Sequence, residues 1–79
     1  MTNSEKYKKV FIDTFSIQEN QLQEDIQYNT IPQWDSIGHM SMVAELEDAF
    51  GITIETDDII NFSSYKKGLD ILAKYGVAF

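Results

Sequence analysis

The chain has 79 residues, enough for a single small domain spanning residues 1–79. It has no cysteine, which excludes disulfide bonds and thiolate metal sites, and 13 acidic residues outnumber six lysines to give a net charge of −7. This charge disfavours nucleic acid and anionic membranes as partners and favours the basic surfaces of other proteins. No apolar run is long enough for a membrane span or a signal peptide, so we expect a cytoplasmic protein without stable membrane insertion. We also expect a monomer.

A first helix is predicted over residues 3–15. Thr2 and Glu5 match the capping box, in which each side chain accepts a hydrogen bond from the backbone N–H of the other residue. Apolar residues then recur at helical spacing and predict one buried face. These residues are Tyr7, Val10, Phe11 and Phe15.

A long polar connection follows, from Ser16 to Trp34, without helical periodicity. Pro32 disfavours helix at Ile31, the residue before it. Apolar residues are nevertheless spaced through the connection. We expect them to pack against the helices and so hold the connection across them. They are Ile17, Leu22, Ile26, Tyr28, Ile31 and Trp34.

A second helix is predicted to open at the Asp35-Ser36 pair and to run to Phe50. Both Asp35 and Ser36 are strong N-cap residue types, and Gly51 stands where a helix-ending glycine is expected. Ser36 therefore lies in the first turn, beside unpaired N–H groups and the positive end of the helix dipole. Such a position favours a phosphate group.

The apolar residues of this helix divide into two stripes on a helical wheel. The first stripe matches a core face and contains Met42, Val43, Leu46, Ala49 and Phe50. The second lies beside Ser36 and contains Ile37, Met40 and Ala44. Two interpretations of the second stripe stay open at this point, namely core packing against the long loop, or a docking strip for a partner around a modified serine.

The remaining chain predicts an extended connector and two further helical segments. Residues 52–54 alternate like a strand but have no second strand to pair with. Thr56 is expected to cap a short helical turn, and Ser63 or Ser64 a final helix that ends just before Gly76. Glu55, Asp57 and Asp58 are interpreted as acids at a helix start and not as metal ligands, because no calcium-loop pattern is present.

These elements predict an all-α fold. We expect a small four-helix bundle with three longer helices and one short helix, and a long loop between the first and second helices. No metal site and no catalytic site are predicted.

At the second helix the residues resemble those of the acyl carrier proteins. The resemblance rests on Asp35-Ser36-Ile37 and on the helix end Glu45-Leu46-Glu47-Asp48-Ala49-Phe50-Gly51, with the serine near mid-chain. It implies that Ser36 carries 4′-phosphopantetheine, covalently attached from coenzyme A. It further implies a carrier, not an enzyme, that holds acyl groups as thioesters and delivers them in fatty-acid, polyketide or related acyl biosynthesis.

The resemblance also implies a site and its partners. Asp35, Ile37 and Gly38 would surround the attachment serine, with Gly38 leaving space where the arm or a partner approaches. The partners would be a phosphopantetheinyl transferase and acyl-transferring or synthase enzymes with basic docking surfaces. The surface that they contact would consist of Ile37, Met40, Ala44, Glu45, Glu47 and Asp48.

Three alternatives accompany this interpretation. Gly38 and His39 depart from the commonest carrier pattern, in which an acid follows the serine and the residue after it, so the pathway whose enzymes recognise the protein stays open. A carrier of amino-acyl or other specialised acyl groups is one alternative. An unmodified, acidic helical interaction module is another. His39, three residues after Ser36, suggests a hydrolytic pair, but no orienting group or oxyanion hole accompanies it, so a packed histidine is favoured.

Overall fold

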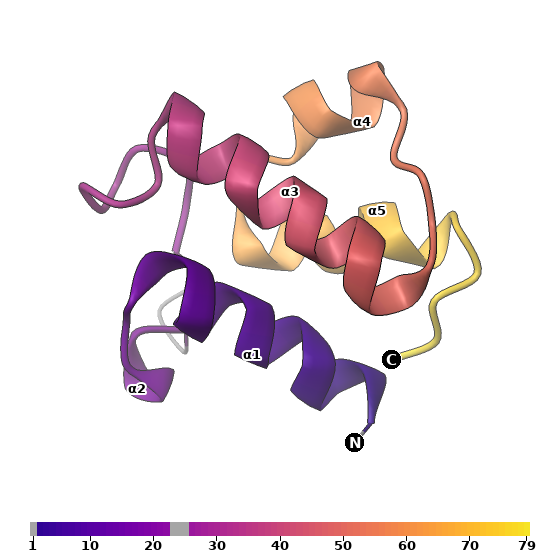
Figure 1. The fold of residues 1–79 in the computed structure, drawn as a ribbon, viewed down its shortest axis with the longest axis horizontal. Helices are drawn as coiled ribbons and strands as arrows, with labels where there is room; N and C mark the ends of the chain where they lie inside the picture. Colours follow the sequence, from indigo (N-terminus) through magenta and orange to yellow (C-terminus); the bar gives the residue numbers. More distant parts are fainter. Residues whose placement is uncertain (1, 23–25) are drawn as a thin grey trace.

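The computed structural model describes residues 2–22 and 26–79, and the regular structure of these two segments is helical (Figure 1). In chain order the helices are α1 (Asn3–Phe15), α2 (Glu19–Leu22), α3 (Ser36–Phe50), α4 (Thr56–Asn61) and α5 (Tyr65–Ala73). The predicted all-α bundle with a long loop before the serine helix is confirmed. The loop differs from the prediction in one respect, because it contains the four-residue α2.

Local signals set the ends of α1 and α3 as predicted. The capping box forms, since Thr2 Oγ1 accepts from the Glu5 N–H at 3.2 Å and Glu5 Oε1 accepts from the Thr2 N–H at 3.4 Å. Asp35 caps α3, and Gly51 ends it in the left-handed conformation at φ 64°.

The long loop is held to the helices by its apolar residues. Ile17, Leu22, Ile26 and Trp34 are all buried in the core, as predicted, and Ile31 packs against it partly buried. Tyr28 is the exception, with 40% of its surface exposed. The loop is also tied to the C-terminal half of the chain by an isolated antiparallel bridge between Gln27 and Ser64.

Aromatic side chains form the centre of the molecule. Tyr7, Phe11 and Phe15 line one face of α1, and Phe11 contacts the Trp34 and Phe62 rings. The fully buried aliphatic and methionine residues beside them come from α3 and α5. They are Met42, Val43, Leu46 and Leu72.

Gly68 allows α5 to approach this aromatic centre. A Cβ at this position would lie 2.1 Å from Phe62 Cζ and 2.2 Å from Tyr7 Oη. The residue therefore costs helix propensity but permits a contact that no larger side chain allows.

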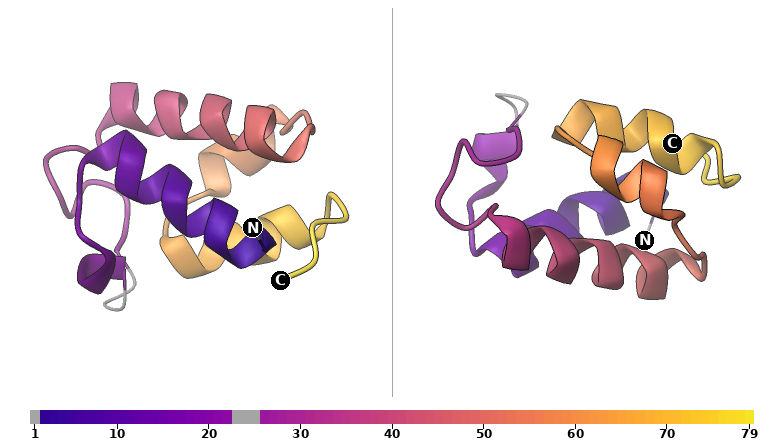
Figure 2. Two further views of the ribbon diagram at one scale, coloured as in Figure 1. Left: turned by 60° about the horizontal axis from the view of Figure 1, so that its bottom comes forward. Right: turned by 90° about the horizontal axis from the view of Figure 1, so that it is seen from above.

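The short helix α4 lies above α3 and α5 in Figure 1 and between them when the molecule is seen from above in Figure 2. Its cap is Glu55, without a side-chain hydrogen bond, so the prediction of Thr56 as cap is wrong by one residue. Asp58 in its first turn is buried and forms an ion pair with Lys74 at 2.6 Å. The Tyr75 hydroxyl donates to the other oxygen of the same carboxylate.

Helix α5 begins as predicted and ends slightly early. Ser64 is its cap, and its hydroxyl accepts from the Lys67 N–H at 3.0 Å. The helix ends at Ala73 with Lys74 as the C-terminal cap, so Gly76 lies two residues past the cap and not directly after it. The start of α1 lies near the C-terminal end of the chain (Figure 1). The Asn3 side chain donates to the Ala78 carbonyl at 2.9 Å.

Candidate functional site: a serine at the start of α3 and the pocket beside it

Ser36 is the first residue of α3, and its side chain is exposed. The neighbouring Asp35 performs the capping, because its Oδ1 accepts from the Gly38 N–H at 2.8 Å. The Asp35 carbonyl also accepts from the His39 N–H at 2.8 Å. The Ser36 hydroxyl thus stands at the positive end of the helix dipole without being needed as the cap.

Tyr28 contacts this serine from the long loop. Its hydroxyl lies 3.2 Å from Ser36 Oγ, within hydrogen-bond distance. Its ring and the His39 ring form a T-shaped contact, with centroids 5.4 Å apart and planes at 84°. The sequence predicted only apolar packing of Tyr28 against the helices. No local pattern relates a loop tyrosine to a serine eight residues later.

His39 is buried, and both of its ring nitrogens are hydrogen-bonded. The Trp34 indole N–H can only donate, and it lies 2.9 Å from His39 Nδ1, which must therefore be the unprotonated nitrogen. The proton of the neutral ring is then on Nε2, which donates to the Ile59 carbonyl at 2.8 Å. His39 thus joins the loop, α3 and α4, and neither ring nitrogen is left to act as a base on Ser36.

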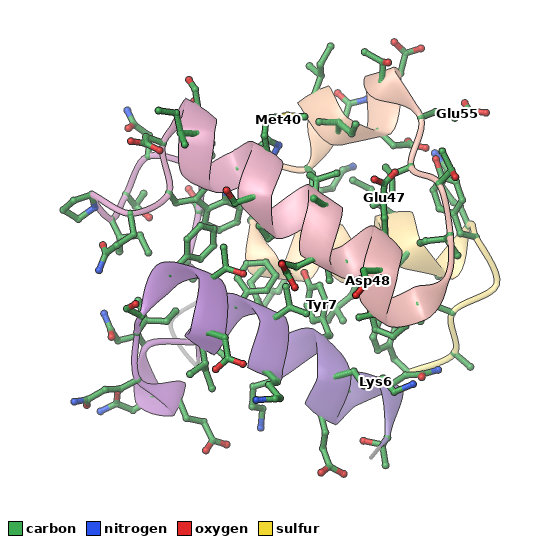
Figure 3. The ribbon with its side chains drawn as sticks, in the orientation of Figure 1. Lys6, Tyr7, Met40, Glu47, Asp48 and Glu55 are labelled. Atoms are coloured by element: carbon green, nitrogen blue, oxygen red, sulfur yellow. The ribbon has the colours of Figure 1, made fainter. Side chains whose placement is uncertain are left out.

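A pocket of about 370 Å³ opens beside Ser36, between the first half of α3 and α4. Apart from the serines, its wall is mostly apolar and aromatic. The lining residues are Tyr28, Ser36, His39, Met40, Ile59, Ile60, Phe62 and Ser63. Figure 3 shows Met40 on the side of α3 that faces α4.

The second apolar stripe of α3 lies on the surface. Ile37 is 79% exposed and Met40 is 54% exposed, and Ala44 is exposed as well. On α4, Ile60 is 72% exposed and lines the same pocket as Met40. Packing against the loop, the first of the two interpretations of this stripe, is therefore wrong for Ile37 and Met40.

The acidic residues of α3 have different surroundings. Glu45 and Asp48 are exposed, whereas Glu47 is half-buried and its Oε2 accepts from the Ile54 N–H at 2.8 Å. Glu47 thus holds the connector after α3 through its carboxylate, and its contribution to a partner surface stays a prediction.

Glu45 and Asp48 also line a groove of about 550 Å³ between α3 and α1, opposite Lys6 and Lys9. Figure 3 shows Asp48 and Lys6 on the neighbouring sides of these two helices. The groove is larger than the pocket at Ser36, but its lining mixes both signs of charge and does not include the serine. The smaller pocket, which includes Ser36, is therefore the candidate site.

The reason predicted for Gly38 is also wrong. A Cβ on Gly38 would lie 2.0 Å from the Gln33 carbonyl oxygen and 3.2 Å from the Phe15 ring. The missing side chain thus makes room for the protein's own loop and core, and not for an arm or a partner.

Two negative findings apply to residues 2–22 and 26–79. Every helix in these segments is too short or too polar to cross a membrane. Within the same residues, no three His, Cys, Asp or Glu side chains gather in a way that would hold a metal ion.

The geometry defines a small helical protein that presents a serine hydroxyl at a helix N-terminus beside an apolar pocket. Among known proteins, the chain is similar to the acyl carrier protein of Petrotoga mobilis (strain DSM 10674 / SJ95), with 24% identity over 70 residues, which are 89% of this chain and 82% of that protein. No family model matches the chain, and no solved structure matches it significantly. The similarity supports a carrier role in general.

Proposed function

We propose that the protein is an acyl carrier protein that holds acyl groups as thioesters on 4′-phosphopantetheine attached to Ser36. The observation that carries the proposal is the exposed Ser36 hydroxyl at the first position of α3, with Asp35 as the cap. A modified serine must be accessible to a transferase, and its modification must not remove a helix cap. Both conditions hold at Ser36.

The surroundings of Ser36 suit the arm and its cargo. A phosphodiester on Ser36 Oγ gains from the helix N-terminus, which favours negative charge. The flexible arm would present one thioester to several enzymes at a high effective concentration. The apolar pocket beside the serine would receive part of the acyl group, and Met40 would adapt its shape to the cargo.

The surface of α3 suits basic partner enzymes. Glu45 and Asp48 supply exposed negative charge, and Ile37 and Met40 supply exposed apolar area next to the serine. We propose that this surface binds a phosphopantetheinyl transferase and the enzymes that load and unload the arm. Charge would steer their encounter, and the apolar side chains would be buried in the complex.

A hydrolytic role for Ser36 is disfavoured by the surroundings of His39. Catalysis by a serine needs a base with a free ring nitrogen at the hydroxyl. Both nitrogens of His39 are used, one by Trp34 and one by Ile59. The proposed role of the protein is therefore that of a substrate carrier for other enzymes.

The test is modification by a transferase in the presence of coenzyme A, followed by intact mass spectrometry. The wild type should gain the mass of one phosphopantetheine, and Ser36→Ala should gain none. The exposed apolar strip would also fit the alternative, an unmodified helical interaction module. That alternative predicts that neither protein gains mass while a known carrier in the same reaction does.

A further inference from the structure

Tyr28 meets the candidate serine with a polar atom, although it belongs to a different segment of the chain. Its hydroxyl lies 3.2 Å from Ser36 Oγ and the pocket beside Ser36 includes both residues. A phenolic hydroxyl is a good donor, and a serine oxygen has two lone pairs with which to accept. The contact is thus a hydrogen bond to the atom that would react.

The backbone of this loop segment is fastened on both sides of Tyr28. The Tyr28 N–H donates to the Ser63 carbonyl at 2.8 Å, and the Tyr65 N–H donates to the Ile26 carbonyl at 2.9 Å. On the other side, the Asn29 N–H donates to the Trp34 carbonyl at 2.9 Å. These bonds tie the loop to the segment between α4 and α5 and to the residue before the α3 cap, which fixes the position of the tyrosine relative to Ser36.

The ring of Tyr28 is supported by its packing on His39. That histidine is itself held by Trp34 and by the carbonyl of Ile59. The ring therefore has a support that does not depend on its hydroxyl. Replacing the tyrosine by phenylalanine would keep this support and remove only the hydrogen bond to the serine.

We propose that Tyr28 is a positioning residue for the modification of Ser36. This inference rests on the proposed function. In this role the Tyr28 hydroxyl acts as the donor of the hydrogen bond to Ser36 Oγ, holds that oxygen in place, and stabilises the negative charge that develops on it as it reacts.

The step to which Tyr28 contributes is a phosphoryl transfer from coenzyme A. Ser36 Oγ forms a bond to the β-phosphorus of the diphosphate, and the bond from that phosphorus to the bridging oxygen breaks. Adenosine 3′,5′-bisphosphate leaves with the electron pair of the broken bond. The hydroxyl proton of Ser36 passes to a base on the transferase.

The test compares Tyr28→Phe with the wild type at varied carrier concentrations, with Tyr65→Phe as the matched control. Tyr65 also loses a hydroxyl in this control, but its ring packs on Tyr7 and Phe11, away from the pocket at Ser36. We expect Tyr28→Phe to lower kcat roughly three- to tenfold, the effect of a single hydrogen bond, with KM changed less than about twofold. Tyr65→Phe should leave both constants close to those of the wild type.

A spectroscopic readout separates this role from a purely structural one. The Tyr28 hydroxyl contacts Ser36 Oγ, the atom that would carry the phosphodiester, so its loss should move the ³¹P resonance of the modified protein. Tyr65→Phe should leave that resonance in place. The unfolding midpoint of Tyr28→Phe should match that of the wild type, because the ring packing is retained.

The outcomes distinguish a failure of the role proposed for Tyr28 from a failure of the proposed carrier function. If the wild type accepts the arm and Tyr28→Phe shows the wild-type kcat and ³¹P resonance, the role of Tyr28 is refuted and the proposed function stands. A rise in KM without a fall in kcat also refutes it, because it would make Tyr28 a docking residue. If the wild type accepts no arm while a known carrier does, the proposed function itself fails.

Discussion

Both faces of α3 carry large apolar residues, but these are buried on one face and exposed on the other. On the inner face, Met42 and Leu46 are 0% exposed and pack against the aromatic centre. On the outer face, Ile37 is 79% exposed and Met40 is 54% exposed. Burial stabilises the fold, so the inner face accounts for stability, and the outer face requires a different explanation. The position of the outer strip beside Ser36 suggests that partners use it.

The largest expected effect is on the inner face. Leu46→Ala should lower the free energy of unfolding by about 2–5 kcal/mol, because it removes a fully buried side chain and leaves a cavity. Chemical denaturation followed by circular dichroism measures this. A loss below about 1 kcal/mol would mean that the inner face of α3 is not part of the core.

A smaller loss of stability is expected at Glu47, an acidic residue of α3. Glu47→Ala should cost about 1–2 kcal/mol of unfolding free energy, since the half-buried carboxylate accepts from the Ile54 N–H. The matched variant is Glu45→Ala, which is exposed and should change stability by less than about 0.5 kcal/mol.

The variants Glu47→Ala and Glu45→Ala also separate a role in stability from a role in partner binding. Glu45→Ala should weaken binding to a transferase, and more so at low salt than at high salt. Equal stability of the two variants would contradict the distinction made between Glu45 and Glu47.

On the outer face, stability should change little while function changes. Ile37→Ala and Met40→Ala should each cost at most about 1 kcal/mol, because both side chains are mainly exposed. Both should nevertheless slow modification of Ser36 or acyl transfer, which a mass-based time course measures. If they destabilise the protein as much as Leu46→Ala does, the outer strip is part of the core.

The smallest effect concerns the attachment of α4, whose residues complete the pocket at Ser36. Hydrogen bonds from Lys74 and Tyr75 hold the pKa of Asp58 below the ordinary value of 3.8. A carboxylate with a lowered pKa contributes stability above its unfolded pKa and loses this contribution as the pH falls through its folded pKa.

Asp58→Asn should therefore be less stable than the wild type at neutral pH, by a small amount, because Lys74 is largely exposed to solvent. The difference should begin to close as the pH approaches the ordinary pKa of an aspartate and should vanish only below the lowered pKa of folded Asp58. Thermal unfolding of both proteins across this pH range is the measurement. A difference that stays constant with pH would rule out the ion pair as its cause.

Sequence patterns predicted what depends on near neighbours. The capping of α1 by Thr2, of α3 by Asp35 and of α5 by Ser64 follows from interactions over three residues. The two stripes of α3 follow from helical periodicity, and the first was predicted to be core, but only the structure shows that the second is exposed. The function suggested by Asp35-Ser36-Ile37 came from a family resemblance and remains a proposal.

The features that were missed depend on distant residues. The space at Gly38 is filled by Gln33 and Phe15, and the carboxylate of Glu47 is bonded across the turn to Ile54. Tyr28 reaches Ser36 only because the loop is fastened to the segment after α4. No periodicity or cap pattern encodes such contacts. The helix α2 was missed because four mostly polar residues are too few to show a helical period.

The central claim is that Ser36 carries the phosphopantetheine arm. Asp35 caps α3, which leaves the Ser36 hydroxyl exposed beside the pocket. The most direct measurement is tandem mass spectrometry of peptides from the protein purified after co-expression with a transferase. We predict that phosphopantetheine is found on the peptide that contains Ser36 and that the fragment ions assign it to this residue. Attachment to any other residue, or an unmodified peptide when a known carrier in the same cells is modified, would contradict the claim.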